Sequence, residues 1–216
     1  MEYVAALERM SQLERLHLKS RWTINPGYLS GLTGLKELYF DEPWVDGELF
    51  PVLASLPELE KVTLSVEYLY QDIGRLLELS SLRELHLIPD SFSTDTLYVR
   101  MGALPVNTNL KILSLSGFKI HDMDVENQGK EPYFGTRANE FLSHFSGLEE
   151  LELRSNQLQD LEFVRSMPEL RILDISDNYV TDVQALLSCP RLEKLICKDN
   201  QIRNLEILPE TVEVVQ

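Results

Sequence analysis

Three stretches near the end of the chain repeat one pattern of apolar residues, and this pattern decides the fold. They are residues 148–161, LEELELRSNQLQDL; residues 170–183, LRILDISDNYVTDV; and residues 192–205, LEKLICKDNQIRNL. When the first leucine is numbered one, apolar residues hold positions one, four and six, and asparagine holds position nine. Side chains of a strand alternate between two faces, so positions four and six share a face. Each stretch is therefore predicted to begin with a short strand that is buried on one face.

The same pattern extends through the chain toward the N-terminus. Positions one, four and six hold no polar residue in any copy, and the copies start 22, 24, 23, 28, 38, 22 and 22 residues apart. Self-similarity at a period of about 20–30 residues indicates a solenoid, in which stacked copies bury one continuous core. The eight copies begin at Leu13, Leu35, Leu59, Leu82, Leu110, Leu148, Leu170 and Leu192.

The asparagine at position nine predicts how the chain leaves each strand. Its side chain can hydrogen-bond the backbone of the turn, and stacked copies then form a ladder. Only the last three copies have it, as Asn156, Asn178 and Asn200. We therefore expect a less regular N-terminal half, with outer segments that are helical at 47–56 and 72–79. A partial ninth strand is expected at 212–215.

These repeats resemble those of the leucine-rich-repeat superfamily, and the 22-residue units are similar to those of internalins and of nuclear phosphatase-regulator subunits. The resemblance implies an α/β solenoid: an arc with a parallel concave sheet of about eight strands, and with loops or short helices on its convex side. We expect residues 1–216 to form a single leucine-rich-repeat domain with an insertion at about 121–139, and to belong to a larger protein. The resemblance also implies binding of a protein partner.

Composition limits the partners and the compartment. The formal net charge of −15 argues against nucleic acid and anionic membranes, because both bind positively charged surfaces. The longest apolar runs span only a few residues, so no membrane span is predicted. Cys189 and Cys197 are too few for a disulfide framework and are expected to be buried packing residues. The low number of cysteines favours a reducing compartment, and we expect a cytoplasmic location.

Positions three, five and seven point away from the core onto the concave face, where six acidic and six basic residues balance. Neighbouring strands lie about 4.7–4.9 Å apart, so alternating charges at position three of the first four copies should pair internally. Those residues are Arg15, Glu37, Lys61 and Glu84. Apolar side chains on an outward face are typical of protein interfaces, although single isoleucines are also common on plain surfaces. The predicted contact residues on this face are Tyr39, His86, Ile88, Ile112 and Ile172.

Position ten carries a large aromatic residue in three consecutive copies, as Trp22, Trp44 and Tyr68, and again later as Tyr179. This position lies on the loop after the strand, along one rim of the solenoid. Tryptophan and tyrosine are common interface anchors, so Trp22, Trp44 and Tyr68 are predicted to bind the partner. The alternative is that the three rings fold inward and fill the space left by loops that lack the asparagine. Both interpretations stay open.

One copy contains the insertion, ahead of the apolar residues Phe141, Leu142 and Phe145. Long loops in compact folds are usually functional or disordered, so we expect 121–137 to be mobile or sensitive to proteases. The acidic run 122–126 resembles the start of a calcium-binding EF-hand loop. However, Gly129 is misplaced for such a loop, and Tyr133 stands where it needs glutamate.

No residues are arranged for catalysis, and no metal, cofactor or small-molecule substrate is expected. His17 and His86 share a repeat position three strands apart, which is about 14 Å and too far for one metal ion. The sequence has no Cys-x-x-Cys, no glycine-rich phosphate loop and no nucleophile with an evident base.

The predicted function is a non-catalytic protein-protein interaction module that binds its partner with the concave face and the adjacent rim. Such a module could serve as a scaffold, a receptor arm or a regulatory subunit. The first alternative is an extracellular adhesion domain of the internalin kind. The second is a substrate-recognition domain attached to an enzyme.

Overall fold

The strands of the repeats form one long parallel sheet. The computed structural model describes residues 6–19, 24–41, 48–66, 72–89, 95–122 and 134–216. Within them, nine strands are hydrogen-bonded in chain order, and every neighbouring pair is parallel. The eight predicted strands and the partial ninth are confirmed. They are β1 (Arg15–Lys19), β2 (Glu37–Asp41), β3 (Lys61–Val66), β4 (Glu84–Pro89), β6 (Ile112–Ser114), β8 (Glu150–Glu152), β9 (Ile172–Asp174), β10 (Lys194–Ile196) and β11 (Glu213–Val215).

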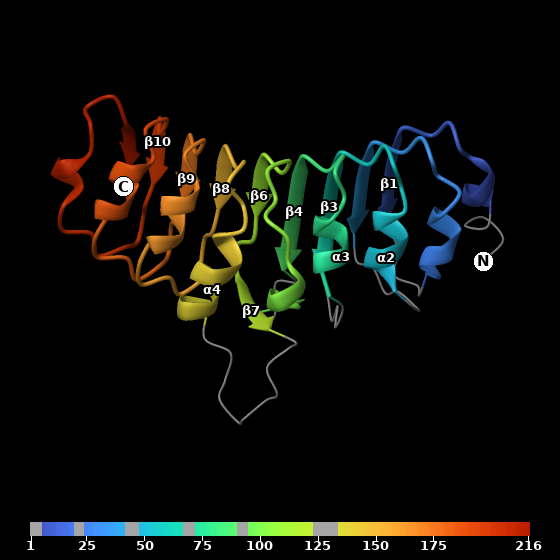
Figure 1. The fold of residues 1–216 in the computed structure, drawn as a ribbon, viewed down its shortest axis with the longest axis horizontal. Helices are drawn as coiled ribbons and strands as arrows, with labels where there is room; N and C mark the ends of the chain where they lie inside the picture. Colours follow the sequence, from blue (N-terminus) through green and yellow to red (C-terminus); the bar gives the residue numbers. More distant parts are fainter. Residues whose placement is uncertain (1–5, 20–23, 42–47, 67–71, 90–94, 123–133) are drawn as a thin grey trace, which may run out of the picture.

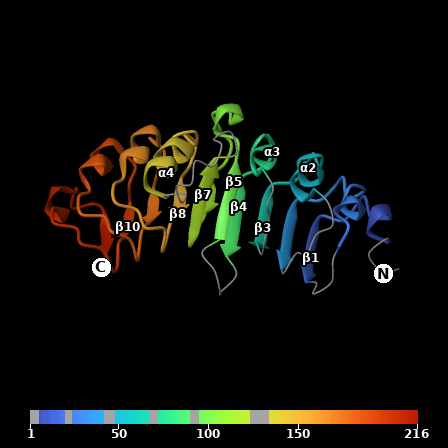
Figure 2. The same ribbon diagram turned by 90° about the horizontal axis from the view of Figure 1, so that it is seen from below.

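The sheet curves into an arc, with its strands on the inner side and short helices on the outer side (Figure 1, Figure 2). The helical segments predicted for 47–56 and 72–79 are confirmed, and each is shorter than its predicted range. They are the α-helices α2 (Leu49–Ala54) and α3 (Gly74–Leu77). The remaining helices are α4 (Phe134–Leu142) and the 3-10 helices η1 (Ala6–Arg9), η2 (Pro26–Leu29), η3 (Met101–Ala103), η4 (Glu162–Ser166), η5 (Gln184–Ser188) and η6 (Leu205–Ile207).

The core lies between the sheet and the outer helices. Positions one, four and six of the inner repeats are fully buried, as at Leu148, Leu151 and Leu153. The corresponding leucines of the first repeat pack against the core but stay partly exposed, because the described residues stack on only one side of them. A strand of this kind thus gains its full burial only from a repeat on each side.

The asparagine at position nine joins each turn to the turn of the repeat before it. The Asn178 side-chain carbonyl accepts hydrogen bonds from the backbone N–H groups of Asn156 (3.1 Å) and Leu158 (2.9 Å). Its amide group donates to the carbonyls of Leu153 (2.8 Å) and Ile175 (2.8 Å). The asparagines one repeat before and one repeat after also bond across to the preceding repeat. The predicted ladder is confirmed.

Repeat position eight, just before the asparagine position, has a left-handed backbone in the turns of the C-terminal repeats. The φ angle is 79° at Gly117, 57° at Ser155, 55° at Asp177 and 54° at Asp199. Strands β6, β8, β9 and β10, which precede these turns, have three residues, whereas β1–β4 have five or six. Pro89 holds this position in the fourth repeat, and its ring fixes φ near about −65°, which excludes the left-handed turn. The fourth repeat therefore continues its strand farther, to Pro89 itself.

The insertion is regular at both of its ends. Strand β7 (Phe118–Asp122) pairs in parallel with β5 (Asp95–Val99) in a separate two-stranded sheet. Helix α4 then starts at Phe134 and is anchored by Phe141 and Phe145, whose rings are buried and 5.1 Å apart. Strand β7 and helix α4 thus border the insertion, because β5 offers a pairing partner and α4 an apolar face. That residues 121–137 are mobile or sensitive to proteases stays a prediction. Residues 123–133, including the acidic run, lie outside the described residues.

Cys189 and Cys197 are free thiols buried at repeat positions of the core, as predicted. Burial raises the pKa of both thiols, and the Asp174 carboxylate raises the pKa of Cys197 further. Because the thiolate is the reactive form, we expect both cysteines to react slowly with Ellman's reagent in the folded protein at mildly alkaline pH. Addition of denaturant should make both react at once. Fast reaction of either thiol without denaturant would contradict its burial.

Candidate protein-binding face

Three rows of outward side chains cross the concave face, at repeat positions three, five and seven. The strand register sets equivalent residues side by side, such as His17 beside Tyr39 and Glu84 beside Ile112. Directly opposite side chains on one face of a sheet interact with each other. The chemistry of the face therefore follows from the order of residues along each row.

In β1–β4 the charged side chains of these rows are paired with one another. The ion pairs are Arg15–Glu37 (3.1 Å), Lys19–Asp41 (2.6 Å) and Lys61–Glu84. Beside them, the rings of His17 and Tyr39 meet edge to face with centroids 4.4 Å apart. These contacts confirm the predicted internal pairing of the N-terminal charges, so this part of the face has little charge left for a partner.

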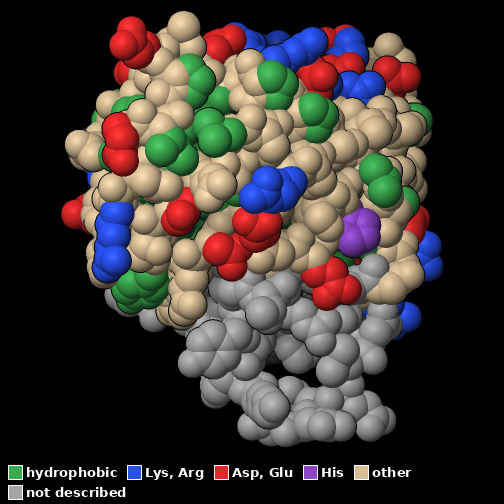
Figure 3. All heavy atoms as spheres, turned by 60° about the vertical axis from the view of Figure 1, so that its left-hand side comes forward, with side chains coloured by type: hydrophobic (Ala, Val, Ile, Leu, Met, Phe, Trp, Pro, Cys, Tyr) green, Lys and Arg blue, Asp and Glu red, His purple; other side chains and the backbone are tan. Residues whose placement is uncertain are grey.

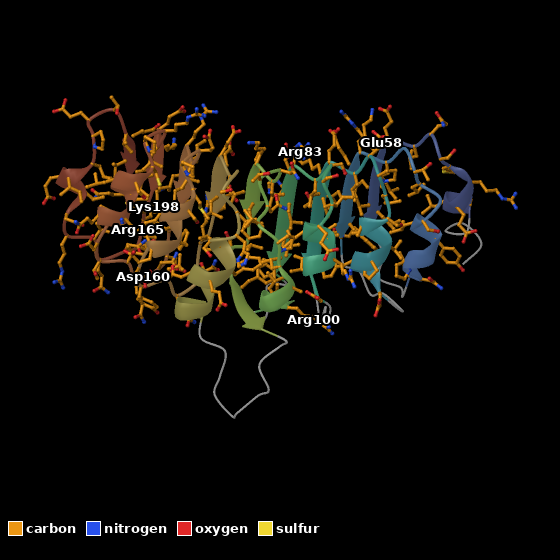
Figure 4. All side chains as sticks on the ribbon, viewed as in Figure 1. Glu58, Arg83, Arg100, Asp160, Arg165 and Lys198 are labelled. Atoms are coloured by element: carbon orange, nitrogen blue, oxygen red, sulfur yellow. The ribbon has the colours of Figure 1, made fainter. Side chains whose placement is uncertain are left out.

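A second ladder of charges follows the rim where the chain enters the strands, at repeat position two. The ion pairs along it are Glu14–Lys36 (3.1 Å), Lys111–Glu149 (3.2 Å) and Arg171–Glu193 (2.9 Å). The hydrogen bond from Arg171 lowers the pKa of the Glu193 carboxyl and raises that of the Arg171 guanidinium. In Figure 4 this rim is the upper edge, where Arg83 and Glu58 lie. The ladder was not predicted.

A buried carboxylate lies in the position-five row on β9. Asp174 is 1% exposed and accepts hydrogen bonds from the Ser176 backbone N–H (3.0 Å) and hydroxyl (2.7 Å). The Arg154 guanidinium lies over its other oxygen, with Nε and one Nη each 2.6 Å from Oδ2. The two charges therefore neutralise each other within the protein, and the Arg154 guanidinium is paired with Asp174.

The pairing along the face is interrupted between β4 and β6. The two strands pair only as far as His86 and Ser114, whereas β4 continues beyond this point to Pro89. Ile88, on that extension, is 41% exposed, and Ile112 on β6 stands opposite Glu84 where an oppositely charged residue would continue the row. On the rim, Arg83 and Lys111 bring two positive residues into consecutive repeats. The centre of the arc therefore lacks the charge pairing found toward its N-terminal end.

Comparison with known proteins agrees with this architecture. The family described as Leucine Rich repeats (2 copies) matches residues 146–188 and 168–210. The match covers the C-terminal repeats, and the arc of parallel strands is the fold of leucine-rich-repeat proteins. Its sequence identity to the solved structures named below is under 25%, so they share its fold alone.

Two crystal structures of internalins from Listeria monocytogenes are similar to this leucine-rich-repeat chain. Internalin C2 superposes with a TM-score of 0.69 at 22% identity, over 98% of this chain and 81% of the other. The internalin inlF superposes with a TM-score of 0.64 at 19% identity, over 94% of this chain and 53% of the other, so this chain spans about half its length. No curated protein sequence matches the chain.

The leucine-rich-repeat face brings together some of the predicted contact residues. His86 and Ile88 lie on β4 and Ile112 on the neighbouring β6, where the register sets His86 opposite Ser114 and Ile112 opposite Glu84, and Ile88 follows beyond the last paired residues. Ile172 follows two strands farther on, on β9, and is half-buried. Tyr39, which is 37% exposed, lies two strands away on the other side, in contact with His17.

The predicted rim aromatics Trp22, Trp44 and Tyr68 lie outside the described residues. Tyr179, the aromatic at the same position of a later repeat, is described, and its side chain is 58% exposed. Position ten can thus present an aromatic ring to solvent in a leucine-rich repeat that has the asparagine turn. Whether the three N-terminal rings do the same stays a prediction.

Two acidic residues of the face, Glu150 and Glu152 on β8, were not predicted as contact residues. Both are half-buried, and neither forms an ion pair with a side chain that the structure describes. The signal was present in the sequence: in the position-three row, Glu150 stands between Ile112 and Ile172. We define the central patch as His86, Ile88, Ile112, Glu150, Glu152 and Ile172.

The surface around the C-terminal end of the arc is mixed in character. Figure 3 looks toward the C-terminal end of the arc and shows hydrophobic side chains in separate small patches, with acidic and basic side chains intermixed along the upper edge.

Within the described ranges, no three His, Cys, Asp or Glu side chains gather in a way that could hold a metal ion. No helix among the same residues is long and apolar enough to cross a membrane.

Proposed function

We propose that the chain is a non-catalytic protein-protein interaction module and that its central patch is the main contact with the partner. The observation that carries this proposal is the interruption between β4 and β6. There, the exposed Ile88 and the half-buried Ile112 replace the charge pairs that occupy the same rows toward the N-terminus.

Energetics favours binding at such a place. Partners gain affinity by burying apolar anchors near the centre of an interface, while paired charges at its edge contribute little. The central patch has this arrangement, because Ile88, Ile112 and Ile172 are bordered by the satisfied pairs Lys61–Glu84 and Arg154–Asp174. The curvature of the sheet adds a rigid concave surface that needs no reorganisation on binding. We include in the contact the rim formed by the position-ten loops, on which Tyr179 is an exposed aromatic residue.

Affinity capture from cells of the source organism tests this proposal. Ile88→Asp and Ile112→Asp should each reduce capture of the partner by about tenfold or more, because each places a charge in the apolar centre. Leu187→Asp is the matched control: Leu187 is 55% exposed on η5, on the outer side of the arc, and should keep capture unchanged. Melting temperatures separate lost binding from lost folding. A partner retained by both isoleucine variants, or lost equally with Leu187→Asp, would overturn the proposal.

The identity of the captured protein also discriminates among the roles of the module. A cytoplasmic regulator or assembly component supports a scaffold, receptor arm or regulatory subunit. A surface protein of another cell supports an adhesion domain, and a substrate of an enzyme that carries these repeats supports a recognition domain.

A further inference from the structure

We propose that the segment bound by the central patch carries an arginine side chain flanked by apolar residues, and that its guanidinium binds Glu150 and Glu152. This inference rests on the proposed function, since it names the chemistry of the partner at the same face. It starts from two acidic residues whose charges the described part of the protein leaves unpaired.

Glu150 has no oppositely charged neighbour in its row. The strand register places Ile112 on one side of it and Ile172 on the other. Arg171 acts on it only through a longer-range electrostatic interaction, without a direct ion pair. Arg171, however, already forms two hydrogen bonds of 2.9 Å with the two carboxylate oxygens of Glu193. Glu150 therefore keeps its capacity for a direct ion pair.

Glu152 is in the same condition for a different reason. Its neighbours in the row are Ser114 and Asp174. The basic residue nearest in sequence, Arg154, forms two contacts of 2.6 Å with Asp174 instead. The Arg154 charge is thus used by Asp174, and Glu152 forms no ion pair with a cation of the described residues.

The other acidic residues in the position-three row show what is missing. Glu37, Glu84 and Glu213 each contact a cation on the neighbouring strand. A half-buried carboxylate without such a contact loses hydration and gains nothing in return, which makes it a favourable place for an incoming cation. Three of the four acidic residues in this row thus form ion pairs, and Glu150 forms none with the described residues.

The geometry suits arginine in particular. Glu150 and Glu152 are two residues apart on β8, so their side chains leave the same face about 6–7 Å apart. A planar guanidinium with five donors can bond both carboxylates, or one in bidentate fashion. Its aliphatic stem and the neighbouring apolar residues can pack on Ile112 and Ile172. The net charge of −15 favours approach of such a basic segment.

Selection of peptides from a random displayed library against the whole chain tests the inference. Peptides that bind the wild-type protein should be enriched in arginine next to apolar residues. The double variant Glu150→Gln and Glu152→Gln should bind the selected peptides at least about tenfold more weakly, because it keeps the shape and removes both charges. Glu37→Gln is the matched control in the same row. Its charge is already used by Arg15, so affinity should be unchanged.

The outcomes separate this inference from the proposed function. If Ile112→Asp abolishes binding while the double glutamine variant binds normally, the concave face binds peptides but the arginine site is wrong. Enrichment of peptides without basic residues leads to the same conclusion. If neither the isoleucine nor the glutamate variants affect the selected peptides, the proposed function itself is contradicted. Loss of binding in the double variant, with the control unaffected and the melting temperature preserved, supports both.

Discussion

Leu173→Ala is expected to lower the free energy of unfolding by about 2–5 kcal/mol, the usual cost of truncating a buried leucine. Leu173 is 0% exposed on β9 and pairs in register with Leu151 on one side and Leu195 on the other. Regular repeats on both sides leave little room for the core to collapse around the missing atoms. Urea unfolding, followed by circular dichroism, measures the effect.

The control for this variant is Leu187→Ala, which truncates an exposed leucine on the outer side and should change the free energy of unfolding by less than about 0.5 kcal/mol. A loss of less than about 1 kcal/mol for Leu173→Ala would show that position four does not carry the core.

Asn178→Ala is expected to cost about 2–4 kcal/mol, because a buried hydrogen-bonding group left without a partner costs about 1–3 kcal/mol. The variant leaves the backbone N–H groups of Asn156 and Leu158 without their acceptor. Both lie in the turn of the preceding repeat, so the damage should spread beyond the altered turn. Urea unfolding again gives the magnitude.

Gln201→Ala serves as the comparison, since Gln201 is exposed and lies at position ten of the next repeat. Its stability should be near that of the wild type. If Asn178→Ala were equally mild, the ladder would be a consequence of the turn geometry and would not stabilise the fold.

The sheet could be predicted from the sequence because its signal is local and repeated. The aliphatic residue at position four is buried in every inner copy, so the same pattern predicts the same structure each time. The small sheet of β5 and β7 could not be predicted in this way. Each of its strands occurs once, and each finds its partner in another repeat, at Asp95 opposite Phe118.

The binding face was predictable in part for a related reason. Period-two alternation assigned His86, Ile88 and Ile112 to the outward side, and the structure places them on neighbouring strands. Alternation does not show which of the outward charges already form ion pairs within the protein. Asp174 is buried because Arg154 folds over it, a choice of side-chain direction that repeat position alone does not specify. The row in the sequence thus marks Glu150, which stands between two isoleucines, whereas the unpaired state of Glu152 became visible only in the structure.

The rim ladder shows the opposite case, in which a usable signal was overlooked. Position two alternates in sign from Glu14 to Lys36 and from Glu149 to Arg171, and residues at one repeat position are neighbours in a parallel stack. The pairing therefore follows from the sequence once that row is considered. Such exposed pairs contribute little to stability, because water and salt screen them.

Site-directed photocrosslinking tests the central claim most directly. A photoreactive amino acid is placed at Ile112, on the concave face, or at Leu187, on the outer side, and each protein is irradiated in cells of the source organism. The concave-face account predicts one dominant crosslinked protein from Ile112 and none from Leu187. Crosslinks of equal yield from both positions, or from Leu187 alone, would contradict it.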